Sequence, residues 1–416
     1  MSDPRNADWL SYDEALARIL EPCRPLGSEV VPTEEALGRA LSEDVTADVD
    51  HPPWDNSAMD GYAVRSPDVE GARPEAPVSL PLSDDIAAGE FPRGPLQPGT
   101  AARLMTGAPV PEGATGVIRV EHSDGAVDGR VRFYRDTDAI RNIRQRGEDV
   151  SRGDVVLRAG DEVTPAAVAV LALTGVREVR TARRPRIGIL ANGDELADFD
   201  QVEEVRAGRK IMNSNSYALA AQLRTAGAEP VSLGIARDDL DSVRQKLAQA
   251  TGLDGLISSA GVSVGERDRV KLALADLGWE RVFWRARIRP GSPITFGFLG
   301  GRPFWGLPGN PVSAMVTFEV FLRPAVRRMA GYGAIGPARL TARARKAIRS
   351  DPGLTHFFRV RLTPVPGDFP LAELTGPQGS GLLTSMSRAD GLACIPEGIE
   401  EVEAGDRLDV IPLTWR

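Results

Sequence analysis

The spacing of apolar residues changes along the chain, and each change predicts a different kind of structure. Apolar positions three or four residues apart predict helices over residues 11–20 and 33–43. From about residue 60 to 140 the apolar runs are short and separated by Gly, Pro and Asp, which is typical of a small antiparallel barrel or sandwich. Thr164 before Pro165 then marks the start of another helix, because Thr caps well and Pro fits the first helical position.

Beyond residue 185 the pattern alternates between apolar strands and helices. The expected strands cover 186–191, 230–235, 254–259, 282–289 and 304–307, and the expected helices cover 215–226, 239–250, 268–277 and 311–329. Such alternation predicts an α/β layer with a mostly parallel sheet. Short strands return after residue 332, as in FFRVRLTPV and DRLDVIPL, and predict a second all-β unit.

These changes predict a multi-domain chain that combines α/β and all-β parts. A length of 416 residues agrees with this, since domains usually hold about 100–200 residues. We expect a helical connector domain at 1–50 and 141–180, an inserted β domain at 51–140, an α/β domain at 181–332 and a C-terminal β domain at 333–416.

Charge and composition exclude several classes of partner. The net charge is −8 and no dense Lys/Arg cluster occurs, so nucleic acid and anionic membrane surfaces are poor partners. The chain has no run of 18 apolar residues and its first residues lack a signal-peptide pattern. We therefore expect a cytoplasmic protein.

Cysteine and histidine contribute little to the candidate chemistry. Cys23 and Cys394 are far apart and have no second ligand at metal-binding spacing, so neither a disulfide framework nor a zinc site is expected. His51, His122 and His356 are scattered. Carboxylates must therefore carry any acid-base or metal chemistry.

The most informative segment reads SAGVSVGERDRVK and directly follows the apolar run LDGLIS. Gly261 and Gly265 would let backbone amides approach a ligand, and the helix that follows would point its positive end at the same place. Glu266 and Asp268 add negative charges, and Lys271 adds a positive charge. The segment therefore predicts a site that binds a phosphate, either directly or through a bridging divalent cation.

Acidic residues also follow two other strands of the expected sheet. Asp194 and Glu195 follow the first strand, and Asp238 and Asp239 follow the second. Ligands bind beyond the carboxyl ends of such strands, and several carboxylates around a phosphate would require a hard cation such as Mg²⁺. The alternative is that Asp194 and Asp238 are only helix caps.

Two further segments offer groups for an anion. In GLPGNPVSA, Pro308 helps to turn the chain, Asn310 can cap the next helix and Ser313 can donate to an oxyanion, although a Ser there is often a plain capping residue. The segment RARIRPGSP brings Arg287 and Arg289 beside a Pro-Gly turn, and guanidinium groups suit oxyanions.

Seven sequence blocks, in one order along nearly the whole chain, resemble the signature blocks of the MoeA-type molybdopterin molybdenumtransferases, which are related to the C-terminal domain of gephyrin. The blocks are DNSAMDGYA, MTGAPVPEGA, NIRQRGEDV, NGDEL, SAGVSVGERD, GLPGNPVSA and SMSRADGLA. The resemblance implies an elongated homodimer built from a helical connector, an inserted β-barrel-like domain, a doubly wound α/β domain resembling molybdopterin adenylyltransferases, and a C-terminal β domain. It also implies that molybdate reacts with adenylylated molybdopterin, with Mg²⁺-dependent release of AMP, in a cleft shared by two subunits.

The resemblance also implies roles for individual residues. The positions of the functional acids and hydroxyls are held by Asp60, Thr106, Asp149, Glu195, Asp238 and Asp268. Of these, Asp238 and Asp268 are the expected Mg²⁺ ligands, since both follow strands of the α/β layer. Substrate contacts are expected from Gly261, Ser263, Gly265, Lys271, Arg289, Pro293, Pro308, Ser313, Arg359 and Ser380, among which Arg289, Ser313, Arg359 and Ser380 stand at the family's molybdate positions.

Four positions depart from the pattern of many family members. Asn192 stands where Thr is common, Ala260 where a second Gly is common, and Arg289 and Ser292 where Lys is common. Because Ser292 removes a cation, we expect weaker molybdate binding, and the preference between molybdate and tungstate stays open. Ala260 is expected to be tolerable only with a negative φ.

Two alternative functions fit part of the sequence. A molybdopterin adenylyltransferase would use the fold expected at 186–330, but it would not need the N-terminal 180 residues or the C-terminal β unit. A gephyrin-like scaffold would not need the pocket, but the long linker it would use is missing. An adenylyltransferase is also a candidate partner, as supplier of the substrate.

Overall fold

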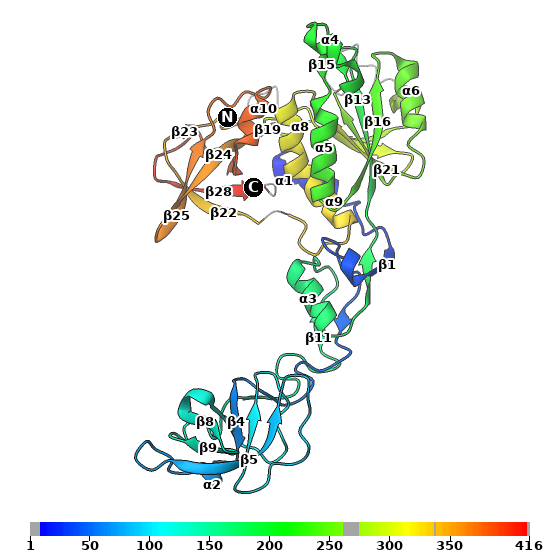
Figure 1. The fold of residues 1–416 in the computed structure, drawn as a ribbon. Helices are drawn as coiled ribbons and strands as arrows, with labels where there is room; N and C mark the ends of the chain where they lie inside the picture. Colours follow the sequence, from blue (N-terminus) through cyan, green and yellow to red (C-terminus); the bar gives the residue numbers. More distant parts are fainter. Residues whose placement is uncertain (1–8, 261–273, 337, 414–416) are drawn as a thin grey trace.

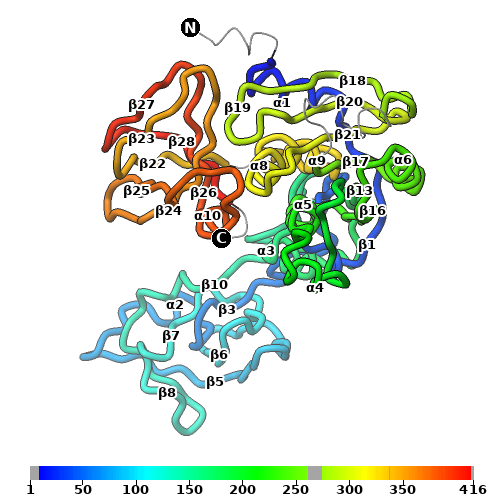
Figure 2. Tube along the Cα trace, turned by 90° about the horizontal axis from the view of Figure 1, so that it is seen from above, coloured from blue at the N-terminus to red at the C-terminus, as the bar shows by residue number. Residues whose placement is uncertain are grey.

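The computed structural model describes residues 9–260, 274–336 and 338–413. The chain is elongated: a β unit lies at one end, and an α/β unit and a second β unit lie side by side at the other (Figure 1). The view from above shows the same separation (Figure 2). The predicted multi-domain fold class is confirmed.

The connector between the two ends contains less helix than its pattern predicts. Helix α1 (Tyr12–Leu20) lies at the α/β unit rather than between the two ends (Figure 1). It begins at a capping box in which the backbone amide of Glu14 donates to the Ser11 side chain and the Ser11 amide donates to the Glu14 carboxylate. Helix α3 (Pro165–Leu173) begins at Thr164, as predicted. The connector's short ribbons are β1 (Ser28–Pro32) with β12 (Glu178–Ala182), β2 (Val45–Thr46) with β11 (Val155–Leu157), and β3 (Asn56–Ser57) with β10 (Ile143–Arg144).

The helix predicted over 33–43 is wrong. Only a 3₁₀ turn, η2 (Thr33–Glu35), forms there. Gly38 has φ +70°, which ends any helix, and Leu41 forms an isolated β-bridge with Thr181. Contact with a distant strand therefore overrides the helical spacing of the apolar residues.

The inserted β unit is a six-stranded sheet with the order β7-β4-β6-β5-β9-β8. Its strands are β4 (Gly61–Val64), β5 (Val78–Ile86), β6 (Ala101–Leu104), β7 (Gly116–Arg119), β8 (Ser123–Val127) and β9 (Arg130–Phe133), and its short helices are α2 (Ser66–Val69) and η3 (Val120–His122). All pairings are antiparallel except β5 with β6. The short strands predicted for this region are confirmed.

The α/β unit has a sheet of order β16-β13-β17-β21-β20-β18, of which the first four strands are parallel. The strands are β13 (Arg186–Asn192), β16 (Glu229–Ala236), β17 (Gly255–Ser259), β18 (Glu280–Phe283), β20 (Thr295–Leu299) and β21 (Arg302–Leu307). The other elements of the unit are β14 (Leu196–Ala197), η4 (Phe199–Gln201), α4 (Val202–Arg206), β15 (Ile211–Met212), α5 (Ser214–Thr225) and α6 (Leu240–Ala248). The mostly parallel sheet and the alternation of strands and helices are confirmed among the described residues, whereas the helix predicted over 268–277 lies largely outside them.

Helix formation over 311–329 is also confirmed, although its middle is wound differently. Helix α8 (Pro311–Thr317) passes through a π-helical turn (Phe318–Leu322) into α9 (Arg323–Met329). Pro324 has no N–H for the carbonyl of Val320, and the hydroxyl of Tyr12 donates to that carbonyl instead (3.4 Å). The contact fastens α1 against this helix.

The C-terminal β unit has the sheet order β19-β24-β25-β22-β28-β26, and β24 also pairs with β26. Its elements are β22 (Leu340–Ala344), β23 (Ile348–Arg349), β24 (Thr355–Val365), β25 (Asp368–Leu374), α10 (Leu383–Ser387), β26 (Gly391–Ile395), β27 (Glu401–Val402) and β28 (Arg407–Pro412). The single strand predicted over 282–289 is wrong, because β18 stays in the α/β sheet whereas β19 (Ile288–Arg289) pairs with β24. This crossing brings Arg289 into the C-terminal unit.

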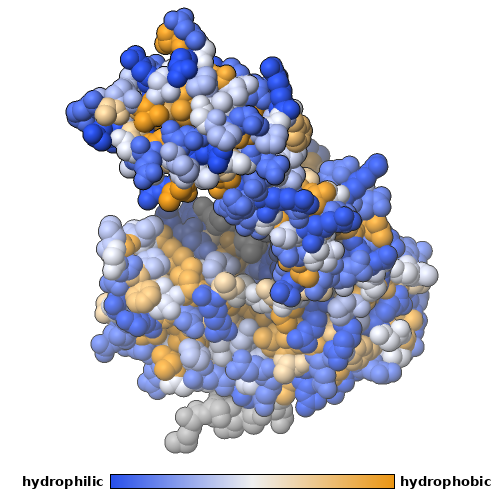
Figure 3. All heavy atoms as spheres, turned by 90° about the horizontal axis from the view of Figure 1, so that it is seen from below, coloured by the Kyte–Doolittle hydropathy of each residue, from blue (hydrophilic) through white to orange (hydrophobic). Residues whose placement is uncertain are grey.

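The surface is largely polar. Seen from below, the molecule has a hollow between the inserted β unit and the other units, with polar side chains over most of the surrounding surface (Figure 3). Within residues 9–260, 274–336 and 338–413, no helix has the length and apolar character needed to cross a membrane.

Candidate active site

A cavity of about 660 Å³ lies where the parallel strands of the α/β sheet end. Asn192 of β13, Ser259 of β17 and Leu307 of β21 reach it, and so do the first residues of α5 and α8. Its lining consists of Asn192, Glu195, Leu196, Ile211, Met212, Asn213, Ser214, Asn215, Ser259, Ala260, Pro293, Leu307, Pro308, Gly309, Asn310 and Pro311. We call it the sheet-edge cavity, and its place is the usual one for a ligand in an open α/β sheet.

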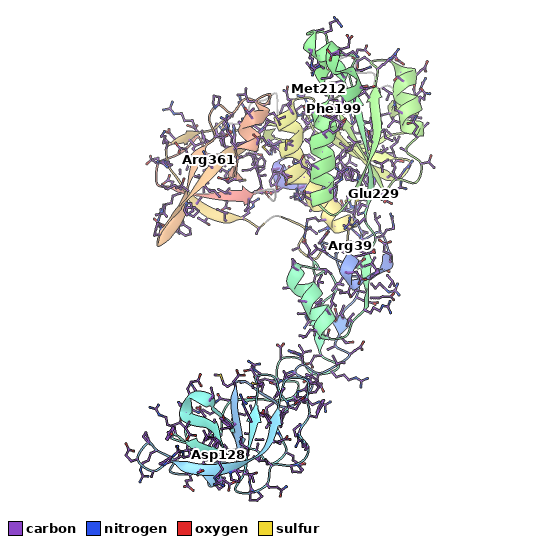
Figure 4. All side chains as sticks on the ribbon, in the orientation of Figure 1. Arg39, Asp128, Phe199, Met212, Glu229 and Arg361 are labelled. Carbon is purple, nitrogen blue, oxygen red and sulfur yellow. The ribbon has the colours of Figure 1, made fainter. Side chains whose placement is uncertain are left out.

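Neutral amides shape the wall of the sheet-edge cavity. The side-chain amide of Asn215 donates to the hydroxyl of Ser259 and to the carbonyl of Gly309, both at 2.8 Å. Asn192 is buried, and its Oδ1 has no hydrogen-bond partner among the described residues. A buried acceptor therefore stays without a donor at the edge of the cavity. Met212, another lining residue, lies at the end of the α/β unit where Figure 4 also labels Phe199.

Ala260 does not have the negative φ that we expected. Its φ is +73°, in the left-handed region that favours glycine. The backbone turns sharply here because the Ala260 amide donates to the carbonyl of Leu307 (3.1 Å). A Cβ placed on Gly309 would lie 3.3 Å from the Cβ of Ala260, so the two loops already approach closely.

Carboxylates gather at the same edge of the sheet. The side-chain amide of Asn192 donates to Oδ1 of Asp238 (2.8 Å), and the backbone amide of Asp194 lies 3.4 Å from its Oδ2. Glu195 lines the cavity and folds over Gly193, where an added Cβ would lie 2.5 Å from Oε2. Asp239, in contrast, accepts from the amide of Ser242 (2.7 Å) and only caps α6.

The glycine-rich part of the predicted site lies outside the described residues. This applies to Gly261, Ser263, Gly265, Asp268 and Lys271. In the described ranges, no group of three or more His, Cys, Asp or Glu residues is arranged to hold a metal. The oxygen donors of Asp238 nevertheless suit a hard cation such as Mg²⁺.

A second cavity, of about 510 Å³, opens between β19 and the C-terminal β unit. We call it the arginine cavity, and it is lined by Arg289, Pro290, Arg349, Ser350, Asp351, His356, Phe357, Phe358, Arg359, Gln378 and Gly379. Arg359 is 0% exposed, and one of its nitrogens, Nη2, lies 3.3 Å from the carbonyl of Pro377 and 3.2 Å from that of Gly379. Among the described residues, Nε and Nη1 have no acceptor.

Such a buried cation with unused donors is costly unless an anion joins it. Burial lowers the pKa of the Arg359 guanidinium. The cost of burying the charge is recovered when an oxyanion supplies charge and acceptors at once.

Sequence reasoning missed His356 and Arg349 as lining residues. His356 stands opposite Arg289 in the register of β19 and β24, and its Nε2 accepts from the amide of Asp351 (3.1 Å). Burial, and next the charge of Arg289, lowers the pKa of His356, which keeps the ring neutral at pH 7. No local pattern indicates either residue, because His356 arrives through a strand pairing that joins segments about 70 positions apart and Arg349 comes from β23, which pairs with β27.

Ser313 and Ser380 line neither cavity. The side-chain amide of Asn310 donates to the hydroxyl of Ser380 (3.0 Å), and the amide of Val312 donates to the Ser380 carbonyl (3.1 Å). Ser313 is buried in the first turn of α8. Since Asn310 lines one cavity and Gly379 lines the other, these contacts make the cavities neighbours.

Arg287, a predicted donor, and Ser292, which stands where Lys is common, are already engaged within the chain. The hydroxyl of Ser292 donates to the carbonyl of Ile288 (2.5 Å), and Arg287 donates to Glu397 (3.0 Å). Neither residue lines the arginine cavity.

Asp60, Thr106 and Asp149 lie on the inserted β unit and its connection, at the other end of the chain (Figure 1). Oδ1 of Asp60 accepts from the amide (2.7 Å) and the hydroxyl (2.8 Å) of Thr106, and these two bonds lower the pKa of Asp60. All three side chains are exposed. One chain alone does not bring them to the cavities.

Three family profiles match the chain in succession: the MoeA N-terminal region (domain I and II) over residues 10–175, a "probable molybdopterin binding domain" over 188–328, and the MoeA C-terminal region (domain IV) over 341–413. Molybdopterin molybdenumtransferase 2 of Mycobacterium tuberculosis is 40% identical over 97% of this chain and 98% of its own length. The chain belongs to the MoeA family.

Other MoeA-family proteins agree along nearly the whole chain. The molybdopterin molybdenumtransferase of a Nostoc species is 35% identical over 93% of this chain and 89% of its own length. A crystal structure of the molybdopterin biosynthesis protein MoeA from Pyrococcus horikoshii has a TM-score of 0.83 at 28% identity, covering 97% of this chain and 100% of its own. The architecture is thus that of MoeA from end to end.

Proposed function

We propose that this protein transfers molybdenum from molybdate to molybdopterin, with adenylylated molybdopterin as substrate and AMP as second product. The two thiol groups of the dithiolene bond to molybdenum through sulfur, their two protons leave with one oxo group as water, and molybdenum keeps its oxidation state. In a separate hydrolysis, a water molecule splits the phosphoanhydride bond of the substrate and releases AMP. The names of the MoeA relatives support the transfer of molybdenum.

The observation that carries the proposal is the buried, incompletely hydrogen-bonded guanidinium of Arg359. It is fully buried at the arginine cavity, and two of its nitrogens have no acceptor among the described residues. Arg289 lines the same cavity. Molybdate is a tetrahedral dianion, and the planar guanidinium presents paired donors to two of its oxygens.

The sheet-edge cavity suits the nucleotide and pterin part of the substrate. It is larger than the arginine cavity, its wall carries neutral amides, and the Asn192 side chain in its lining has an acceptor oxygen without a donor among the described residues. The Asn310–Ser380 contact sets the two cavities side by side. A substrate held in the first would place its dithiolene toward the second.

Asp238, with Asp268, would hold Mg²⁺ at the sheet edge. When bound, the cation neutralises the phosphate groups and favours departure of AMP. Within this chain, the amide of Asn192 holds Oδ1 of Asp238 (2.8 Å) and leaves the remaining lone pairs of the carboxylate for a cation.

We also propose that two chains pair so that the inserted β unit of one faces the cavities of the other. The distance of Asp60 and Thr106 from the cavities of their own chain supports this (Figure 1). The reaction would take place in the cytoplasm, with a molybdopterin adenylyltransferase as supplier of the substrate. Both cysteines, Cys23 and Cys394, are free thiols, as a reducing compartment favours.

The deciding experiment incubates the purified protein with adenylylated molybdopterin, molybdate and Mg²⁺ and measures AMP and pterin-bound molybdenum. We expect release of AMP only when molybdate and Mg²⁺ are both present. Transfer of AMP from ATP to molybdopterin would instead identify an adenylyltransferase. Absence of both reactions would favour the scaffold.

Complementation tests the shared site. At a Mg²⁺ concentration that only just saturates the unaltered protein, an Asp60→Ala chain and an Asp238→Asn chain are each expected to release little AMP, whereas the mixed dimer contains one cleft with both native acids. Mixing should therefore restore part of the AMP release. A mixture that stays inactive after verified subunit exchange would contradict the shared site.

A further inference from the structure

The arginines of the arginine cavity differ in how deeply they lie. Arg359 at the base is 0% exposed, whereas the side chain of Arg349 is 87% exposed. Arg349 belongs to β23, opposite Glu401 of β27, and its Nε lies 3.6 Å from the Glu401 carboxylate. Arg349 thus stands at the mouth of the cavity with a loosely held partner.

The other charged groups in the cavity lining leave an excess of positive charge at the mouth. Asp351 is the acid in the cavity lining, and its Oδ1 accepts from the amide of Gly353 (3.0 Å). His356 is neutral at pH 7, as argued above. Arg289, Arg349 and Arg359 therefore outnumber the single lining carboxylate, and the opening carries a local positive charge within a protein of net charge −8.

We propose that Arg349 captures the oxyanion at the mouth of the cavity and that Glu401 competes with the oxyanion for it. The proposal rests on the oxyanion site of the proposed function. An exposed ion pair at this spacing contributes little stability, so Arg349 can exchange Glu401 for an incoming dianion at small cost. A cation at the entrance of an acidic protein also raises the local concentration of anions.

The two partners must therefore have opposite effects on binding. Molybdate alone is titrated into the whole protein by calorimetry, without pterin, at low and high ionic strength. Arg349→Gln should weaken binding about fivefold at low salt, which corresponds to the ~1 kcal/mol expected of one charge contact at about 4 Å in a water-like medium. Glu401→Gln should tighten binding by a smaller factor, and both changes should shrink at high salt.

The matched control is Arg361→Gln. Arg361 is an exposed arginine of the same β unit, outside the lining of the cavity (Figure 4). It should leave binding unchanged. A double variant, Arg349→Gln with Glu401→Gln, should bind like Arg349→Gln, because Glu401 acts only through Arg349.

The outcomes separate this inference from the proposed function. If Arg359→Gln removes binding but Arg349→Gln matches Arg361→Gln, the oxyanion site stands and the capture role is overturned. If Arg349→Gln weakens binding but Glu401→Gln does not tighten it, the competition is overturned. If the unaltered protein binds no molybdate, the oxyanion site itself fails.

Discussion

The two neighbouring cavities are built by different means. The sheet-edge cavity forms where strands of one sheet end, and neutral amides shape its wall. The arginine cavity forms where β19, β23 and the start of β24 meet a loop at 378–379, and its base is a buried cation with two unused donors. The first cavity is suited to recognise shape and hydrogen bonding, and the second is suited to recognise charge.

The difference shows how a protein of negative net charge can still bind an anion at one local site. A net charge of −8 excludes a general affinity for anions, yet burial of one guanidinium without a protein anion creates a local site for one. Salt, pH and substitution should therefore affect the two cavities differently.

The largest effect is expected from Arg359→Gln. Charge-assisted hydrogen bonds contribute about 1.5–3 kcal/mol, so the half-saturating molybdate concentration should rise by about 100-fold. AMP binding, which we assign to the sheet-edge cavity, should change little. Calorimetry with each ligand checks this, and equal losses for both ligands would show that the cavities do not act separately.

The converse variant is Asp238→Asn, which changes the sheet edge and leaves the arginine cavity intact. An amide is a weaker ligand for Mg²⁺ than a carboxylate, so the Mg²⁺ concentration for half-maximal AMP release should rise by on the order of tenfold. Molybdate binding without pterin should not change. Asp239→Asn, at the capping position of α6, is the matched control and should behave like the unaltered protein.

The stability of the protein should depend on pH through His356, which lines the arginine cavity and not the sheet-edge cavity. Its folded pKa lies below the unfolded value of about 6.5, so the unfolded chain binds more protons as the pH falls below that value. The unaltered protein should therefore lose stability on acidification from about pH 6.5 toward the folded pKa.

The variant His356→Gln keeps a neutral acceptor for the Asp351 amide and should reduce that loss. Melting temperatures across this pH range, measured in parallel for both proteins, provide the comparison. A variant with the unchanged pH slope would assign the acid sensitivity to other groups.

The smallest effect is expected at Ala260 in the sheet-edge cavity. Glycine removes the strain of φ +73°, and part of that gain is offset by the greater freedom of the unfolded chain, so Ala260→Gly should raise stability by about 0.5–1 kcal/mol. Urea denaturation measures this. A loss of stability would mean that the Ala260 methyl packs more favourably than its backbone is strained.

Local sequence was enough to predict the elements whose apolar spacing agrees with their surroundings. The parallel strands β13, β16, β17 and β21 and the helices α5 and α6 followed from alternation, and the start of α3 followed from Thr164 and Pro165. The same pattern placed the sheet-edge cavity, because parallel strands must end together. Arg289 was indicated by its place beside the Pro-Gly turn, whereas Arg359 was expected only through the family resemblance.

What the pattern could not provide depends on contacts between distant segments. A bridge from Leu41 to Thr181 replaced the helix expected over 33–43, and pairing with β24 drew β19 out of the α/β sheet. The same pairing set Arg289 opposite His356 above the buried Arg359. Periodicity reports which face of an element is buried, whereas the neighbour that buries it, and the charge left without a partner there, are set by the tertiary structure.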